Sequence, residues 1–72
     1  MTLARLIKRA TDDGLYEFHD DVPLGRVYDV DLVHARIVPL FNVAKQVAHE
    51  KVLVVDLVRG GWLPLECLEV ES

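Results

Sequence analysis

The chain has 72 residues, of which 51% are hydrophobic and only 7% aromatic, and it carries a formal net charge of −4. That length supports one domain spanning residues 1–72, and so high an apolar content argues against a wholly disordered chain. The single cysteine, Cys67, excludes an internal disulfide framework, and the acidic balance disfavours general binding to nucleic-acid backbones.

The first expected element is a short amphipathic helix over residues 2–10. At helical spacing, one side of this segment is apolar and the other is basic. The apolar side comprises Leu3, Leu6, Ile7 and Ala10. So short a helix is marginal on its own and needs a surface to lie on, either the domain's own core or a partner.

Two strands are expected next, each preceded by a turn rich in polar residues and Gly. Residues 15–19, LYEFH, alternate in polarity and hold two aromatic side chains. Residues 26–33, RVYDVDLV, alternate more regularly, with Tyr28 and Val30 on one face and Asp29 on the other. This pattern is typical of a strand with one face in the core and one in water.

Residues 39–50, PLFNVAKQVAHE, decide the expected architecture. At about 100° per residue, the apolar side chains of this segment fall in one arc, and the polar ones, including His49, fall in the opposite arc. Pro39 suits the first turn of a helix, where its missing N–H costs nothing. We therefore predict a helix over about 39–50.

Two further strands are expected in the last third of the chain. Residues 52–58, VLVVDLV, are rich in β-branched side chains and are the best candidate for a central strand. Residues 62–70, WLPLECLEV, alternate again, and the glycines at 60 and 61 favour a hairpin between the two strands. Pro64 lacks a backbone donor, which indicates an edge strand or a bulge.

The order helix, strand, strand, helix, strand, strand predicts an α+β fold. We expect a small antiparallel sheet of three or four strands, with the 39–50 helix packed on one face and the short N-terminal helix beside it.

The stretch 61–68, GWLPLECL, resembles the closing strands of Src-homology-three-like barrels, and VYDVD at 27–31 is similar to the first strand motif of that family. The resemblance implies an alternative fold, a small SH3-like β-barrel. The chain departs from the family where Cys67 replaces the tyrosine of the ligand groove, and it has no second Trp. Docking of a Pro-rich peptide requires that aromatic surface, so the resemblance does not carry over a peptide groove.

The candidate partner-binding residues are aromatic and basic. Trp62, Tyr16 and Phe18 are candidate anchors for a protein partner, because large aromatic side chains dominate binding energy at interfaces. Arg5 and Arg9 are candidate charged contacts from the basic first ten residues. The competing interpretation of Trp62 is a side chain at the rim of the core that covers the hairpin, since Trp buries a large area on folding.

The sequence contains no recognisable catalytic or metal-binding set. His19, His34 and His49 show none of the spacings of a zinc site, and Cys67 on a strand is most simply a small buried hydrophobe. A domain of this length rarely encloses a pocket that excludes water around a substrate. We therefore expect a non-enzymatic protein, with no catalytic residues, metal, cofactor or small-molecule substrate.

The expected location is the cytoplasm, with no membrane partner. No uninterrupted apolar run in the sequence has the length of a signal peptide's core or of a membrane span.

The expected function is that of a small protein-binding or regulatory protein that occupies a surface on a larger partner. Bacteriophage and mobile-element products that modulate host enzymes such as RNA polymerase offer an analogy in size and charge. Two alternatives stay open: a structural homodimer that pairs through residues 52–58 or the C-terminal edge strand, and a less favoured nucleic-acid-associated domain. The basic side chains available to that domain are Arg5, Lys8, Arg9, Arg26, Arg36, Lys45 and Lys51.

Overall fold

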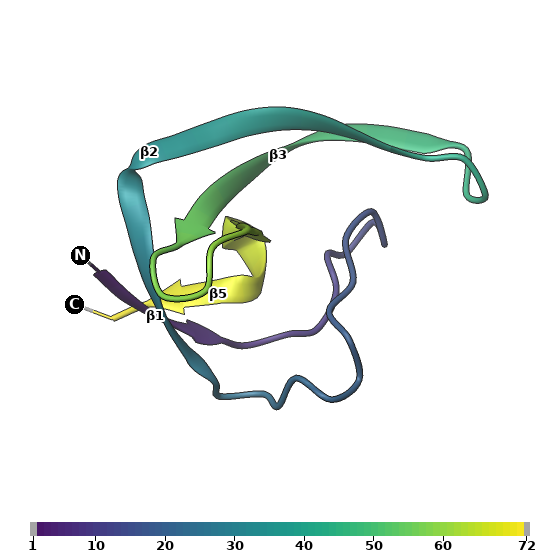
Figure 1. Cartoon of the computed structure of the whole chain (residues 1–72). Helices are drawn as coiled ribbons and strands as arrows, with labels where there is room; N and C mark the ends of the chain where they lie inside the picture. Colours follow the sequence, from purple (N-terminus) through teal and green to yellow (C-terminus); the bar gives the residue numbers. More distant parts are fainter. Residues whose placement is uncertain (1, 72) are drawn as a thin grey trace.

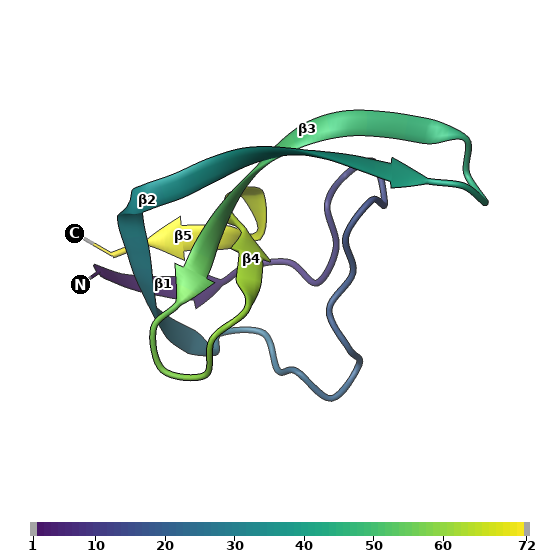
Figure 2. The same ribbon diagram turned by 45° about the horizontal axis from the view of Figure 1, so that its top comes forward.

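The computed structural model describes residues 2–71, which form one antiparallel sheet of five strands in the order β4-β3-β2-β1-β5. The sheet curls around its own core (Figures 1 and 2). The strands are β1 (Thr2–Leu6), β2 (Val27–Asn42), β3 (Val47–Asp56), β4 (Trp62–Pro64) and β5 (Leu68–Val70). A single turn of 3-10 helix, η1 (Leu65–Cys67), connects β4 to β5.

The expected α+β fold is therefore wrong, because η1 is the only helical segment within residues 2–71. The alternative expectation of a small SH3-like barrel fits this small β fold. The stretch 61–68 that resembles that family leads from the β3–β4 turn through β4 and η1 into β5.

The predicted helix at 39–50 is replaced by the far ends of β2 and β3 and the turn that joins them. The two strands pair directly, from Arg36 opposite Leu53 to Asn42 opposite Val47. Side chains assigned to the buried side of the helix are exposed instead, with Phe41 at 59% and Val43 at 70%. A helix gains most of its stability by burying its apolar side, whereas here cross-strand pairing with β3 stabilises the segment.

The predicted N-terminal helix is also wrong, because residues 2–6 form β1 between β2 and β5. Burial in β1 alternates with a period of two, with Ala4 and Leu6 in the core and Leu3 half exposed at 50%. Leu6 lies on the apolar side of the segment whether it is a helix or a strand. In so short a segment the two patterns differ at few positions, so the helical pattern did not distinguish them. Pairing on both sides of β1 satisfies its backbone groups and outweighs local helix propensity.

The expected strands at 26–33 and 52–58 are confirmed in their main parts, the one at 62–70 is divided by η1 into β4 and β5, and the one at 15–19 is wrong. Residues 27–33 lie in β2 and residues 52–56 in β3, and β3 and β4 form the hairpin expected around the two glycines. Pro64 ends β4, an edge strand, as its missing donor predicts. Residues 15–19 form no strand: apart from the isolated bridge of Glu17 to Ala10, they belong to the long loop 7–26.

The core is formed by side chains from all five strands and η1. Val30 and Val54 are fully buried, and Tyr28 is 5% exposed, as the alternation of residues 26–33 predicts. Phe18 and Val22 of the long loop pack against this core from one side. The buried cluster consists of Ala4, Leu6, Tyr28, Val30, Val54, Leu63, Cys67 and Leu68.

β2 bends sharply, and its two halves belong to different parts of the sheet. Its first residues, Val27–Val30, pair with β1, and its register against β3 shifts between Asp31 and Arg36. At this corner the Asp31 carboxylate accepts hydrogen bonds from the backbone N–H groups of Val33 and His34. Beyond the corner β2 continues with β3 as a long ribbon that reaches away from the core (Figure 1).

Candidate protein-interaction surface

The ribbon beyond the corner of β2, residues 36–52, is here called the arm. β1 pairs only with residues 27–30 of β2, and β4 pairs only with residues 53–55 of β3. Within residues 2–71, no further strand pairs with the outer edges of the arm (Figure 2). Two isolated strands are marginally stable in water, so the arm depends on what packs against its two faces.

One face of the arm is apolar and open. Opposite residues of an antiparallel pair share a face, and the register pairs Ile37 with Val52 and Phe41 with Ala48. The exposed fractions are 68% for Ile37, 59% for Phe41 and 38% for Val52. The arm face is defined as these side chains together with Pro39 and its opposite residue, and it comprises Ile37, Pro39, Phe41, Ala48, Glu50 and Val52.

The arm face continues the apolar side of β3 beyond the core. Side chains two residues apart on a strand point to the same side, so Val52 follows the fully buried Val54. The same side of β3 is therefore covered at Val54 and increasingly uncovered toward the tip of the arm. Glu50 is the one charged residue of the arm face, and no ion pair or side-chain hydrogen bond engages it among residues 2–71.

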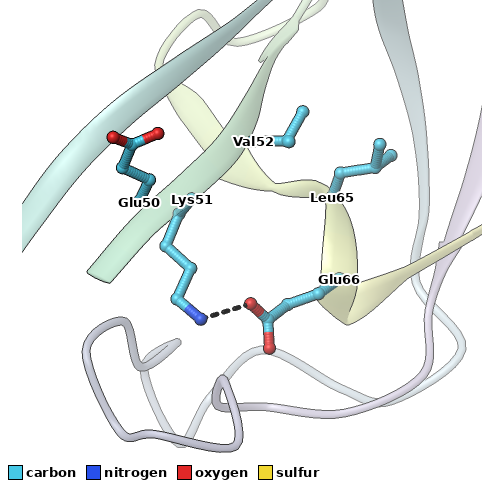
Figure 3. Close-up of a pocket in the computed structure, with 5 residues that line it drawn as sticks. All are labelled: Glu50, Lys51, Val52, Leu65 and Glu66. Atoms are coloured by element: carbon cyan, nitrogen blue, oxygen red, sulfur yellow. Dashed lines mark ion pairs between the residues drawn. The ribbon is translucent and has the colours of Figure 1, made fainter.

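A pocket of about 320 Å³ opens at the root of the arm, between β3 and η1. Val52 and Leu65 form its apolar wall, and Glu66 faces Lys51 across it (Figure 3). Glu50 points away from this ion pair (Figure 3). The arm face and the pocket share Glu50 and Val52.

The opposite face of the arm is held by charged groups from the long loop. Asp13 lies 2.5 Å from the Lys51 ammonium and 2.7 Å from Nδ1 of His49, and Lys51 lies 2.8 Å from Glu66. The hydrogen bond from Lys51, with a second from His49, holds the pKa of the Asp13 carboxyl well below its usual range. The two carboxylates in turn raise the pKa of Lys51. This ion-pair cluster fixes the loop tip beneath the arm.

The structure brings two of the predicted aromatic anchors together and buries part of the third. The Tyr16 hydroxyl donates to the carbonyl oxygen of Trp62 at 3.2 Å, and Tyr16 meets Phe18 edge to face at 5.2 Å. Trp62 is 38% exposed, and the Arg36 guanidinium lies 5.5 Å from its ring centroid. Trp62 thus borders the core and Phe18 packs against it, which leaves less free aromatic surface than three exposed anchors would offer.

The predicted basic contacts are engaged within the chain. Arg5 pairs with Glu71 at 2.7 Å, and Arg9 donates to the carbonyl oxygen of Val22 at 2.9 Å. The other basic residues likewise contact a carboxylate or an aromatic ring. These contacts are Lys8 with Asp12, Arg26 with Tyr28, Arg36 with Trp62, Lys45 with Glu17, Lys51 with Asp13, and Arg59 with Asp56.

Two further titratable side chains, Cys67 and His34, lie outside the ion-pair cluster. Cys67 is fully buried, and this burial raises the pKa of its thiol, which opposes formation of a reactive thiolate. His34 pairs with Asp31 at 2.7 Å on the exposed corner of β2. Within residues 2–71, no three His, Cys, Asp or Glu side chains are grouped so that they could hold a metal ion.

The arm face was not predicted, because Pro39, Phe41, Ala48 and Glu50 were assigned to a helix, whereas Ile37 lay outside every expected element and Val52 began the expected strand 52–58. The signal was present: Ile37, Pro39 and Phe41 alternate with Val38 and Leu40, and such a run of apolar and β-branched residues also fits a strand. A two-stranded ribbon outside the core was not expected, since exposed apolar strands are normally avoided.

No protein-family model matches this sequence, and comparisons with curated proteins and with solved structures found no match. No helix among residues 2–71 has the length and apolar character needed to cross a membrane.

Proposed function

We propose that the chain is a small non-catalytic binding protein that occupies a surface on a larger protein through its arm face. The observation that carries this proposal is the exposure of Ile37, Phe41 and Val52 in one row on a projecting ribbon. Contiguous exposed apolar surface on a small domain is costly in water and is commonly used for recognition. The adjoining pocket between Val52 and Leu65 would receive a side chain of the partner.

The charge distribution supports a protein partner over a nucleic acid. Nucleic-acid backbones are bound by free Lys and Arg side chains, whereas here each basic side chain is already engaged with an acid, a carbonyl or a ring. Glu50 on the arm face would instead attract a basic group of the partner. We place this activity in the cytoplasm. By analogy in size and charge with phage or mobile-element modulators of host enzymes, we propose that the larger partner is a host enzyme such as RNA polymerase.

The test is retention of partners by the immobilised full chain from an extract of the cells in which the gene resides. The arm variant carries Ile37→Ser and Phe41→Ser, and the matched control carries Leu24→Ser and Val33→Ser. The control pair is also exposed, at 53% and 88%, and lies outside the arm face. We expect a polypeptide that is retained by the wild type and the control and lost with the arm variant.

Equal retention by the arm variant and the control would refute the proposed surface. Retention of DNA or RNA that falls with salt and is independent of the arm variant would favour the nucleic-acid alternative instead.

A further inference from the structure

We infer that, in the absence of a larger partner, the arm face is covered by the arm face of a second copy of this chain. The inference rests on the same exposed surface as the proposed function, but it adds a resting state in which that surface is closed. It assigns to the arm a self-association that the larger partner would have to displace.

The size of the surface supports a second copy. Fully exposed Val, Ile and Phe side chains present roughly 150–200 Å² each. Scaled by the exposed fractions of Ile37, Phe41 and Val52, and with Pro39 and Ala48 added, the arm face presents on the order of 400 Å² of apolar surface. Two such surfaces would bury about 800 Å² together, which is the size of a weak and reversible interface.

The distribution of side chains favours packing of face on face over pairing of edge on edge. The open edge of β2 contains Pro39, which offers no N–H and discourages the addition of another strand. Across the face, the large side chain of Phe41 stands opposite the small side chain of Ala48 in the register. A two-fold axis that lies along the arm sets β2 of one copy over β3 of the other, so that each Phe41 covers an Ala48 of the second copy.

The same two-fold axis also keeps the two Glu50 carboxylates apart, and Glu50 is the one charged residue of the arm face. With β2 over β3, Glu50 of one copy faces Pro39 of the second copy, because these two residues are opposite each other in the register. The two Glu50 carboxylates then lie on different sides of the axis, each over a Pro39 and not over one another. A two-fold axis across the strands would set the two carboxylates face to face, which is unfavourable.

The test is the molar mass of the full chain in solution, measured by sedimentation equilibrium from micromolar to millimolar concentration. We expect a reversible equilibrium between a monomer of 8.2 kDa and a species of twice that mass. Phe41→Ser and, separately, Ile37→Ser should each raise the dissociation constant at least tenfold, since every dimer loses two such side chains. Val33→Ser, an apolar change outside the arm face, should leave it unchanged.

Circular dichroism of each variant shows first that the fold is retained, which is expected because both arm positions lie outside the core. A wild-type chain that stays monomeric at millimolar concentration would overturn the inference, as would a dimer that Val33→Ser weakens as much as Phe41→Ser does. The proposed function has a separate readout, which is arm-dependent retention of a partner. If the chain is monomeric but retains a partner through the arm, the proposed function stands and the dimer is refuted. If the chain dimerises but retains no partner, only the proposed function is refuted.

Discussion

At the scale of single residues, a few charged side chains determine how the long loop is attached to the sheet. Asp13 bridges His49 and Lys51 of β3, and Lys51 continues to Glu66 beside η1. His49 was expected to lie on the wet side of a helix; it is exposed, on a strand, and hydrogen-bonded to the loop. Surface ion pairs are usually weak, but a connected group whose side chains are partly shielded is a better candidate for a measurable effect.

The pH dependence of stability should report this attachment. A carboxyl whose pKa is lowered by folding stabilises the protein above its unfolded pKa, about 3.9 for Asp, and loses that contribution as the pH falls. We therefore expect Asp13→Asn to lower the melting temperature at pH 7 and to make its fall between pH 5 and pH 2 shallower than in the wild type. Thermal unfolding followed by Trp62 fluorescence measures both effects.

The control for Asp13→Asn is Asp20→Asn, which makes the same chemical change at an exposed loop residue. Its melting temperature should follow the wild-type dependence on pH. If the melting temperatures of the two variants showed the same slope with pH, the ion-pair cluster would not hold the loop.

At alkaline pH, stability depends on pH in the opposite sense because of Lys51. Folding raises the pKa of Lys51, so its contribution to stability fades as the pH rises beyond its unfolded value of about 10.4.

At the scale of elements, the arm is the feature that distinguishes this chain from a plain small barrel. Its tip is a tight turn in which Gln46 has a φ of 55°, the left-handed region that residues with a side chain seldom occupy. The Asn42 side chain accepts a hydrogen bond from the backbone N–H of Lys45, and the Gln46 side chain donates to the carbonyl of Val43. These local bonds hold the turn that sets the register of the arm.

Substitutions at Gln46 test whether the turn controls the arm. Gln46→Val should cost about 1–2 kcal/mol of unfolding free energy, because a β-branched side chain is strained at positive φ. Gln46→Gly also loses the side-chain hydrogen bond but removes the strain, so it should stay closer to the wild type. Urea unfolding of the pair isolates the backbone effect, and equal stability of the two variants would contradict the turn conformation.

At the scale of the whole molecule, the free energy of unfolding depends on a small core of buried side chains. A chain of this length buries only roughly 60% of its unfolded surface, so each fully buried side chain matters. Val54 is 0% exposed near the C-terminal end of β3, a strand that β2 and β4 flank in the sheet. The arm adds apolar residues that lie outside the core and stay exposed.

The contrast between core and arm can be measured with one kind of substitution. Val54→Asp should unfold the domain, because an unpaired buried carboxylate costs at least about 3 kcal/mol, a large part of the stability of a small domain. Val43→Asp at the tip of the arm, where the side chain is 70% exposed, should leave the fold intact. Circular dichroism and thermal unfolding decide the matter: a folded Val54→Asp variant would mean that the core is misassigned.

The sequence by itself determined the features that depend on near neighbours. Alternation placed Tyr28 and Val30 in the core, two glycines located the β3–β4 turn, and Pro64 indicated an edge strand. These outcomes follow from backbone geometry and polarity over a few residues.

Only the tertiary structure decided whether residues 2–10 and 39–50 are helical. Both segments fit a helical pattern, but strand pairing is formed instead: residues 2–6 pair with β2 and β5, and the two ends of residues 39–50 pair with each other. β1 lies between β2 and β5, and residues 39–42 pair with residues 47–50 across a turn. Such pairing depends on contacts that periodicity within one segment does not record. The exposed arm face follows from the same cause, since it exists only once β2 and β3 extend beyond the strands that cover the core.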